Sequence, residues 1–175
     1  KHDDDRFLVV VSDTMHQHSE FWLKRHIPEG MNVVISDVTG GLCQLNVQGP
    51  RSRELVQRMT SCDMSNEAFP FRHAQEIDIG YARVWCTRIT YVGELGYELF
   101  IPSEMAVHVH ERLVQEGQSV GLRHAGLKAL GSLRMEKAYR DYGHDMDNTD
   151  TVLEVGLGFA CDMEKPGGFL GKEAV

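Results

Sequence analysis

The hydrophobic pattern between residues 42 and 117 constrains the fold more than any other feature of the chain. Runs that alternate apolar and polar residues predict strands, whereas apolar residues three and four positions apart predict helices. If the two runs that meet at Gly80 form a hairpin, the order is typical of a split βαβ, or ferredoxin-like, arrangement. We therefore predict an α+β fold, an antiparallel sheet with its helices on one face. The predicted elements are strand 42–49, helix 50–59, strands 74–80, 82–93 and 95–101, and helix 104–117.

The flanking segments predict further elements with weaker patterns. "RFLVVV" at 6–11 predicts a strand, and Ser12 is a candidate cap for a helix that runs to about His26. "NVVISDVTG" at 32–40 predicts a strand, and Gly40 and Gly41 predict a hairpin turn that connects it to the strand at 42–49. Good helix formers then continue to Gly143, which predicts a helix ending there.

Composition and charge exclude several classes of protein. The 175 residues are 42% hydrophobic and 25% charged, which suits one globular domain or two small ones. No apolar run approaches the roughly 20 residues of a membrane-spanning helix, and the first residues lack a signal-peptide pattern. A net charge of −8 argues against nucleic-acid binding, which needs clustered basic residues. The scattered Cys43, Cys62, Cys86 and Cys161 predict reduced thiols in an intracellular protein.

Two glycine-rich motifs do not satisfy the requirements of nucleotide-binding loops. "GGFLGKE" at 167–173 has Pro166 where a P-loop needs its first glycine, and Glu173 where it needs a hydroxyl. "GLGFAC" at 156–161 lacks the third glycine of a dinucleotide fingerprint. We interpret both as turns.

The paired histidines do not predict a metal site. "HQH" at 16–18 and "HVH" at 108–110 lie within predicted helices. Residues two apart on a helix point about 200° apart, so neither pair can share one ion. We expect structural or solvated histidines and no bound metal.

The stretch "TYVGELGYELF" at 90–100 holds Glu94 between Gly93 and Gly96, inside an otherwise strand-like pattern. Glycines permit backbone angles and close approaches that other residues resist, so a bulge or turn could aim Glu94 at a particular place. A fixed carboxylate offers two acceptors, which complement the N–H and NH₂ donors of a guanine-like or pterin ring. From the residues alone, a hairpin with Glu94 in water explains the pattern equally well.

Four blocks of the chain, in order, resemble the folate-binding aminomethyltransferase superfamily, which includes the glycine-cleavage T-protein. The blocks are "LNVQGPRSRELVQRM" (45–59), "YVGELGYELFIP" (91–102), "LKALGSLRMEKAYRDYGHDMD" (127–147) and "TVLEVGLGF...GGFLGKEA" (151–174). The chain is most similar to the tetrahydrofolate domain of dimethylglycine and sarcosine dehydrogenases. This resemblance implies that the predicted sheet is part of a larger folate-binding aminomethyltransferase fold.

The resemblance implies a folate site around Glu94. In the family, the glutamate of this turn binds the 2-amino and N3 edge of the pterin, and Gly93 belongs to the same turn. Tyr91 and Tyr97 are close enough in sequence to supply aromatic walls, which is an inference from proximity.

The chain departs from the family at the folate's glutamate tail. Leu130 stands where the T-protein has an arginine that meets this tail. Lys128, Arg134 and Lys137 are the alternatives, with Lys128 as our candidate, although helix charges are usually solvated or paired. The family's catalytic aspartate precedes the aligned segment, so no catalytic residue is assigned.

The resemblance also implies a function and a domain plan. An upstream flavin domain carrying FAD would oxidise an N-methyl amine, and tetrahydrofolate would take up the one-carbon unit as 5,10-methylene-tetrahydrofolate. We expect 1–40 to be a partial strand-helix segment of the folate-binding domain and 41–175 its ferredoxin-like segment with the following helix. The flavin domain and a C-terminal β-rich domain would lie outside this chain, which we expect to be an inactive fragment by itself.

Two alternatives remain open at this point: a stand-alone aminomethyltransferase, and a non-catalytic regulatory subunit that keeps the fold. The regulatory subunit would use the fold as an interaction surface. For the dehydrogenase, the expected partners are small molecules, folate and an N-methyl amine, with no nucleic acid and no membrane. The expected compartment is the mitochondrial matrix in a eukaryote and the cytoplasm in a bacterium.

Overall fold

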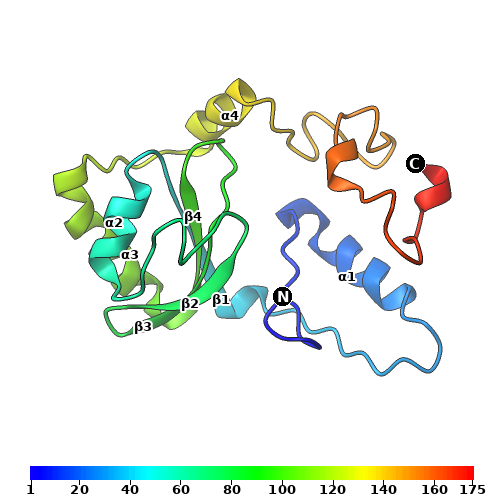
Figure 1. The fold of residues 1–175 in the computed structure, drawn as a ribbon, viewed down its shortest axis with the longest axis horizontal. Coiled ribbons are helices and arrows are strands. Elements are labelled where there is room, and N and C mark those ends of the chain that lie inside the picture. The colour runs from blue at the N-terminus through cyan, green and yellow to red at the C-terminus, as the bar shows by residue number, and fades with distance from the viewer. The chain divides into compact units, whose positions relative to one another are not determined.

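The computed structural model describes all residues from Lys1 to Val175, which form two compact units (Figure 1). One unit comprises residues 36–139, and the other combines 1–35 with 140–175. The predicted division of the chain into 1–40 and 41–175 stays a prediction. None of the helices is long and apolar enough to cross a membrane.

The unit of residues 36–139 contains a four-stranded antiparallel sheet with the strand order β1-β4-β3-β2. Its elements match the predicted ones closely between 42 and 117. The strands are β1 (Leu42–Gln48), β2 (Ala74–Ile79), β3 (Ala82–Thr87) and β4 (Gly96–Pro102), and the α-helices are α2 (Ser52–Met59), α3 (Ala106–Gly117) and α4 (Leu127–Glu136). Three short 3₁₀ helices complete the unit: η2 (Thr39–Gly41), η3 (Ser103–Met105) and η4 (Gln118–Val120).

The α+β class is confirmed, but the ferredoxin-like split βαβ arrangement is not. A split βαβ unit keeps the strands before and after its helix parallel, with one strand between them. Here two strands, β4 and β3, separate β1 from β2, and every pairing is antiparallel. The strands on either side of α2 therefore run in opposite directions.

One hydrophobic core joins the sheet to α2 and α3. Alternation along β4 sends Tyr97, Leu99 and Ile101 to the same face, and all three are completely buried. Helical spacing brings Leu55 of α2 and Val109 of α3 to that core. Figure 1 shows both helices on the same side of the sheet, as the pattern predicted.

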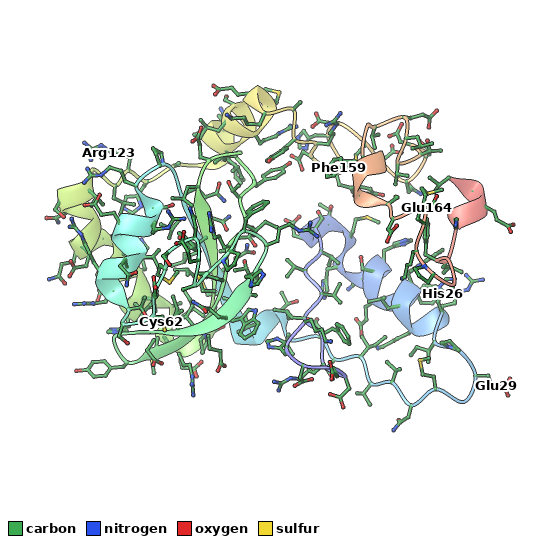
Figure 2. All side chains as sticks on the ribbon, in the orientation of Figure 1. His26, Glu29, Cys62, Arg123, Phe159 and Glu164 are labelled. Atoms are coloured by element: carbon green, nitrogen blue, oxygen red, sulfur yellow. The ribbon has the colours of Figure 1, made fainter.

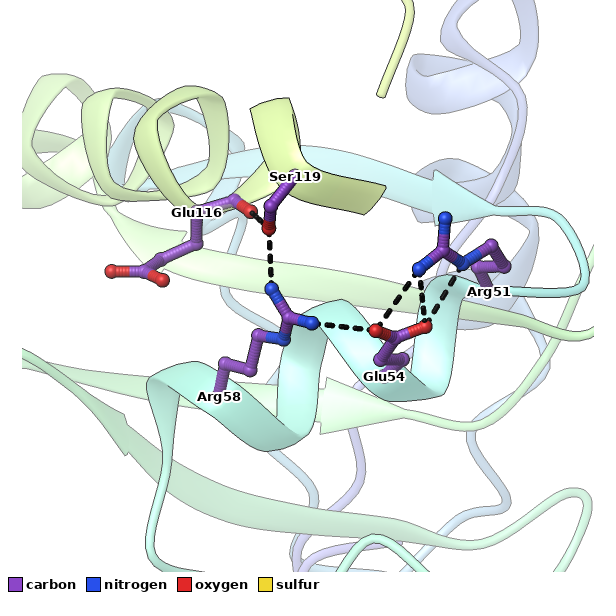
Figure 3. A network of polar contacts seen from close by, with 5 residues as sticks. All are labelled: Arg51, Glu54, Arg58, Glu116 and Ser119. Carbon is purple, nitrogen blue, oxygen red and sulfur yellow. Dashed lines mark hydrogen bonds and ion pairs between the residues drawn. The ribbon is translucent and has the colours of Figure 1, made fainter. Parts of the chain in front are cut away.

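A polar network on the surface connects α2 to the end of α3 (Figure 3). Arg51 donates two hydrogen bonds to Glu54, at 2.9 and 3.0 Å, and these bonds lower the pKa of the Glu54 carboxyl. Arg58 bridges Glu54 and the hydroxyl of Ser119, which in turn donates to the carbonyl of Glu116. The network links the two helices at the surface, whereas their shared core packs them against the sheet.

The unit that includes the N-terminus lacks the strand predicted at 6–11. Residues 6–11 form no ladder, and Phe7, Val9 and Val10 are exposed. A strand needs a neighbour for its backbone hydrogen bonds, which an apolar run alone does not supply. The predicted helix is confirmed as η1 (Asp13–Met15) and α1 (His16–Arg25), although Ser12 makes no side-chain capping bond. The unit also contains η5 (Gly158–Ala160) and η6 (Lys172–Ala174).

The predicted strand at 32–40 and its glycine hairpin are also wrong. Gly40 and Gly41 lie in η2, and neither has a positive φ. Tight hairpin turns need a positive φ at one or both central residues, so this pair cannot close one.

Helix α4 ends at Glu136, before the predicted stop at Gly143. Ala138 adopts a left-handed φ of 57°, and its N–H bonds the carbonyl of Met135. The N–H of Tyr139 returns to the carbonyl of Arg134 at 3.0 Å, which completes a Schellman motif. An alanine in the position that usually holds glycine explains why the sequence pattern missed this end.

All four cysteines are free thiols, as predicted. Cys86 is completely buried in β3, and burial, with a smaller contribution from Cys62, raises the pKa of its thiol to about 12. Cys86 is therefore a protonated core residue at neutral pH. Cys62, labelled in Figure 2, follows α2 and packs partly against the core.

Candidate functional site

Glu94 lines a pocket of about 340 Å³ in the unit of residues 36–139. The strand predicted at 82–93 ends at Thr87, so Glu94 lies in the loop between β3 and β4 and not inside a strand. This loop contributes most of the pocket wall. The lining residues are Phe71, Arg88, Thr90, Gly93, Glu94, Leu95, Gly96 and Tyr139.

The two glycines near Glu94 differ in how strictly the structure needs them. Gly93 has a φ of +70°, a left-handed conformation, and a Cβ there would lie 2.3 Å from Cγ of Lys137. Gly96 begins β4 at a close approach, where a Cβ would lie 3.1 Å from Cγ of Gln48 and 3.2 Å from Cβ of Thr90, so those side chains would have to shift by a few tenths of an ångström. The turn that presents Glu94 therefore depends above all on Gly93.

Hydrogen bonds from the β1–α2 connection hold the Glu94 loop in place. The carbonyl of Leu95 accepts from the N–H of Gly49 at 2.8 Å and from the hydroxyl of Ser52 at 3.1 Å. The hydroxyl of Thr90 donates to Oε1 of Gln48 at 3.3 Å. Glu94 is thus fixed by the residue that follows it, through contacts with a segment more than 40 positions away in sequence.

Replacing Ser52 by alanine tests this support. Ser52 is buried, and its hydroxyl bonds the Leu95 carbonyl, which keeps one other donor when the hydroxyl is removed. We expect a loss of about 1 kcal/mol in the free energy of unfolding, measured by urea denaturation. Ser61→Ala, at an exposed position, is the control and should change it by less than about 0.5 kcal/mol. Equal effects of the two variants would contradict the assigned role of the Ser52 hydroxyl.

Lys137 is the charged neighbour of Glu94. Its Nζ lies 3.7 Å from Oε1 of Glu94, and the two side chains are 46% and 48% exposed. At this length and exposure the pair adds little to stability. The carboxylate therefore keeps acceptor capacity for a ligand in the pocket.

Aromatic side chains surround the Glu94 pocket. Tyr139 and Phe71 line it, and the ring of Tyr139 stacks on Tyr91 with centroids 6.2 Å apart and planes inclined by 20°. The Schellman motif at the end of α4 orients Tyr139, whose carbonyl also accepts a 2.8 Å hydrogen bond from Nη1 of the buried Arg134. A flat ring placed against Glu94 would find aromatic neighbours.

Comparison with known proteins identifies the family. The model of the GCVT N-terminal domain matches residues 1–165. The chain belongs to the GCVT N-terminal domain family. The resemblance inferred from the four sequence blocks is thereby confirmed.

Curated relatives of this GCVT domain include oxidases, dehydrogenases and aminomethyltransferases. It is 43% identical to 4-methylaminobutanoate oxidase (formaldehyde-forming) of Paenarthrobacter nicotinovorans, over 98% of this chain and 21% of that protein. It is 33% identical to mitochondrial dimethylglycine dehydrogenase of Homo sapiens, over 97% of this chain and 20% of that protein. It is 32% identical to an aminomethyltransferase of Thermoanaerobacter pseudethanolicus, over all of this chain and 47% of that protein. The chain thus spans about a fifth of the first two relatives.

The structure of the GCVT domain brings together only some of the site residues predicted from sequence. Glu94 and Gly93 line the pocket, whereas Tyr91 is not among the lining residues and stacks on Tyr139, which is. Tyr97 is completely buried, with its ring 5.9 Å from that of Phe69, and does not line the pocket. Lys128 lies exposed in the first turn of α4, also outside the lining.

Three residues of the pocket lie outside the 90–100 stretch and were not predicted: Phe71, Arg88 and Tyr139. Arg88 directly follows β3 and donates from Nη1 to the carbonyl of Phe69 at 2.8 Å. Phe71 and Tyr139 belong to no periodic pattern, because both lie in connecting segments. The available signals were the closeness of Arg88 to the YVGELG block and the position of Tyr139 within the block 127–147, whereas no signal pointed to Phe71.

The histidines of the GCVT domain make ordinary contacts. His108 accepts a hydrogen bond from the N–H of Tyr81 at 3.2 Å, and His110 stacks on His124 with centroids 5.6 Å apart. His18 stacks on Trp22 within α1. No group of three or more His, Cys, Asp or Glu side chains is placed to hold a metal ion.

Proposed function

We propose that this GCVT N-terminal domain binds tetrahydrofolate, with the pterin ring in the Glu94 pocket. The observation that supports this most strongly is the position of Glu94 on the wall of a pocket whose neighbouring walls are aromatic. A pocket of about 340 Å³ falls within the size range of small-molecule sites. The carboxylate offers two acceptors to the N3–H and 2-amino donors of a pterin.

The chain's own residues would act by positioning and by shielding the ring. Glu94, held through Leu95, would fix the edge of the pterin, Tyr139 and Phe71 would offer aromatic faces to it, and Tyr91 would support Tyr139. Tetrahydrofolate itself supplies the nitrogens that take up a one-carbon unit. Orientation and exclusion of water would be the protein's contribution to such a transfer.

Lys128 is the proposed contact of the folate's glutamate tail. It lies nine residues before Lys137, which is about 13 Å along α4 at about 1.5 Å per residue. Tyr97 is not part of the proposal, because its ring is buried against Phe69.

The function that we propose for the whole protein is that of a dimethylglycine or sarcosine dehydrogenase-like enzyme. An FAD domain upstream would oxidise an N-methyl amine, and the one-carbon unit would pass to tetrahydrofolate, giving 5,10-methylene-tetrahydrofolate. The oxidase and dehydrogenase among the relatives support this plan, since this chain covers only about a fifth of each. The chain alone would be inactive, and the compartment would be the mitochondrial matrix in a eukaryote or the cytoplasm in a bacterium.

A stand-alone aminomethyltransferase is the second candidate, which the Thermoanaerobacter relative favours because this chain covers 47% of it. The two candidates differ in what lies upstream in the gene. A strand-turn-helix with a G-x-G-x-x-G fingerprint would support the dehydrogenase, and its absence would support the aminomethyltransferase.

Calorimetric titration with tetrahydrofolate, under reducing and anaerobic conditions, tests the binding function. We expect saturable binding at one site in the chain. Failure of both the chain and the longer protein to bind, with circular dichroism showing each to be folded, would overturn the proposal. That result would instead support a regulatory subunit that keeps the fold.

A further inference from the structure

The edge of a pterin that Glu94 would bind presents three polar positions in a row: the 2-amino group, N3–H and the 4-oxo group. The first two are donors and match the two oxygens of Glu94, whereas the oxo group is an acceptor and needs a donor from the protein. A binding site that leaves such a group without a partner loses affinity. The donors next to Glu94 therefore decide which ring the pocket prefers.

Lys137 is a donor beside Glu94, over Gly93, although it is not itself one of the lining residues. Its ammonium lies 3.7 Å from Oε1 of Glu94, which is longer than the roughly 2.8 Å of a charge-assisted hydrogen bond. A ring edge can thus bond the ammonium and the carboxylate side by side. The side-chain donors of the lining are less suited: Nη1 of Arg88 bonds the Phe69 carbonyl, its Nε is buried without a partner, and the Thr90 hydroxyl bonds Gln48.

Two features of the fold hold Lys137 against the Glu94 turn: the end of α4 and the contact with Gly93. Lys137 is the C-cap residue of α4, and the Schellman motif after it defines the direction of the chain. Its aliphatic stem lies over Gly93, because a Cβ built on that glycine would meet Cγ, Cδ and Cβ of Lys137 within 3.0 Å. A glycine at 93 thus makes room for this lysine.

We propose that Lys137 and Glu94 together bind the 4-oxo, N3–H and 2-amino edge of the pterin, and that Lys137 makes the pocket selective for a 4-oxo ring over a 4-amino ring. A 4-amino group is a donor and would face the ammonium of Lys137, also a donor. This inference rests on the proposed function and extends it to the chemical class of ring. It assigns Lys137 to the pterin, whereas the sequence had it as an alternative contact for the folate tail.

The test compares folic acid with its 4-amino analogue, which differ at position 4 and at N3, because only the 4-oxo ring carries a hydrogen on N3. Both are titrated into the wild-type protein, Lys137→Met and Lys137→Arg at about pH 8. We expect the wild type to prefer the 4-oxo compound by about 10- to 100-fold, as a charged hydrogen bond would give. Lys137→Met should lower this preference by about tenfold, and any remainder comes from the N3–H that faces Glu94. Lys137→Arg, which keeps a charged donor, should retain most of the preference.

Arg123→Met provides the matched control for the lost charge. Arg123, labelled in Figure 2, follows η4 and donates to the carbonyl of its neighbour Leu122. Its removal should leave the preference at the wild-type value. If Arg123→Met lowers the preference as much as Lys137→Met does, net charge explains the effect and the inference is wrong.

Three further outcomes separate this inference from the proposed function. If Lys137→Met changes the affinity for both compounds equally, Lys137 is only a counter-ion of Glu94, and the inference falls while the function stands. If both compounds bind but Glu94→Gln weakens neither, the pterin is not at Glu94, and both proposals fall. If neither folic acid nor tetrahydrofolate binds to the folded chain or to the folded longer protein, both fall as well.

Discussion

Glu94→Gln is expected to weaken tetrahydrofolate binding by about 30- to 150-fold, which corresponds to about 2 to 3 kcal/mol. Glutamine keeps the shape of the side chain but replaces one acceptor oxygen by an NH₂ donor. That donor would face a donor of the pterin edge, and the charge that strengthens the remaining hydrogen bond is lost. Titration calorimetry of the two proteins with tetrahydrofolate measures the difference.

Glu67→Gln is the control for this experiment, because Glu67 is an exposed carboxylate in the segment between α2 and β2. Its substitution removes the same charge and should change the affinity by less than about twofold, since exposed charges are largely screened. The folded state of Glu94→Gln is checked by its urea midpoint, which should stay close to that of the wild type. Equal tetrahydrofolate affinity in Glu94→Gln and wild type would contradict the proposed role of Glu94.

Tyr97→Ala is expected to lower the free energy of unfolding by about 3 to 5 kcal/mol, as removal of a buried aromatic ring does. Tyr97 is completely buried in the central strand β4, and its ring packs 5.9 Å from that of Phe69. The free energy of unfolding of a small domain is about 5 to 15 kcal/mol in total, so we expect Tyr97→Ala to be only marginally stable. Urea denaturation followed by circular dichroism measures the loss.

Tyr97→Phe separates the ring from its hydroxyl. The Oη atom of Tyr97 is buried without a hydrogen-bond partner, so its desolvation is not compensated. We expect Tyr97→Phe to have the same stability as the wild type or to be more stable by up to about 1 kcal/mol. A loss of stability in Tyr97→Phe would mean that the hydroxyl is hydrogen-bonded, and the assignment of Tyr97 as a purely apolar core residue would be wrong.

The elements between residues 42 and 117 could be predicted because their signals are local. Alternation in β4 and helical spacing in α2 and α3 already contain the information on which face is buried. No local pattern in the sequence shows which strands pair with each other. The split βαβ arrangement and the strand at 6–11 were wrong because a strand forms only against a neighbour, whose identity depends on distant residues.

The sequence alone pointed to Glu94 as a candidate ligand-binding residue, because a carboxylate between two glycines is visible in eleven consecutive letters. It also pointed to the family, through four ordered blocks. Only the tertiary structure decided what surrounds it. Lys137 and Tyr139 reach the turn from the end of α4, more than 40 positions away, and the same folding buries Tyr97, three residues from Glu94. Side chains of neighbouring residues in a strand point to opposite faces, whereas distant segments meet wherever packing is favourable. The neighbouring residues in the sequence therefore identified Glu94, and tertiary packing determined which side chains surround it.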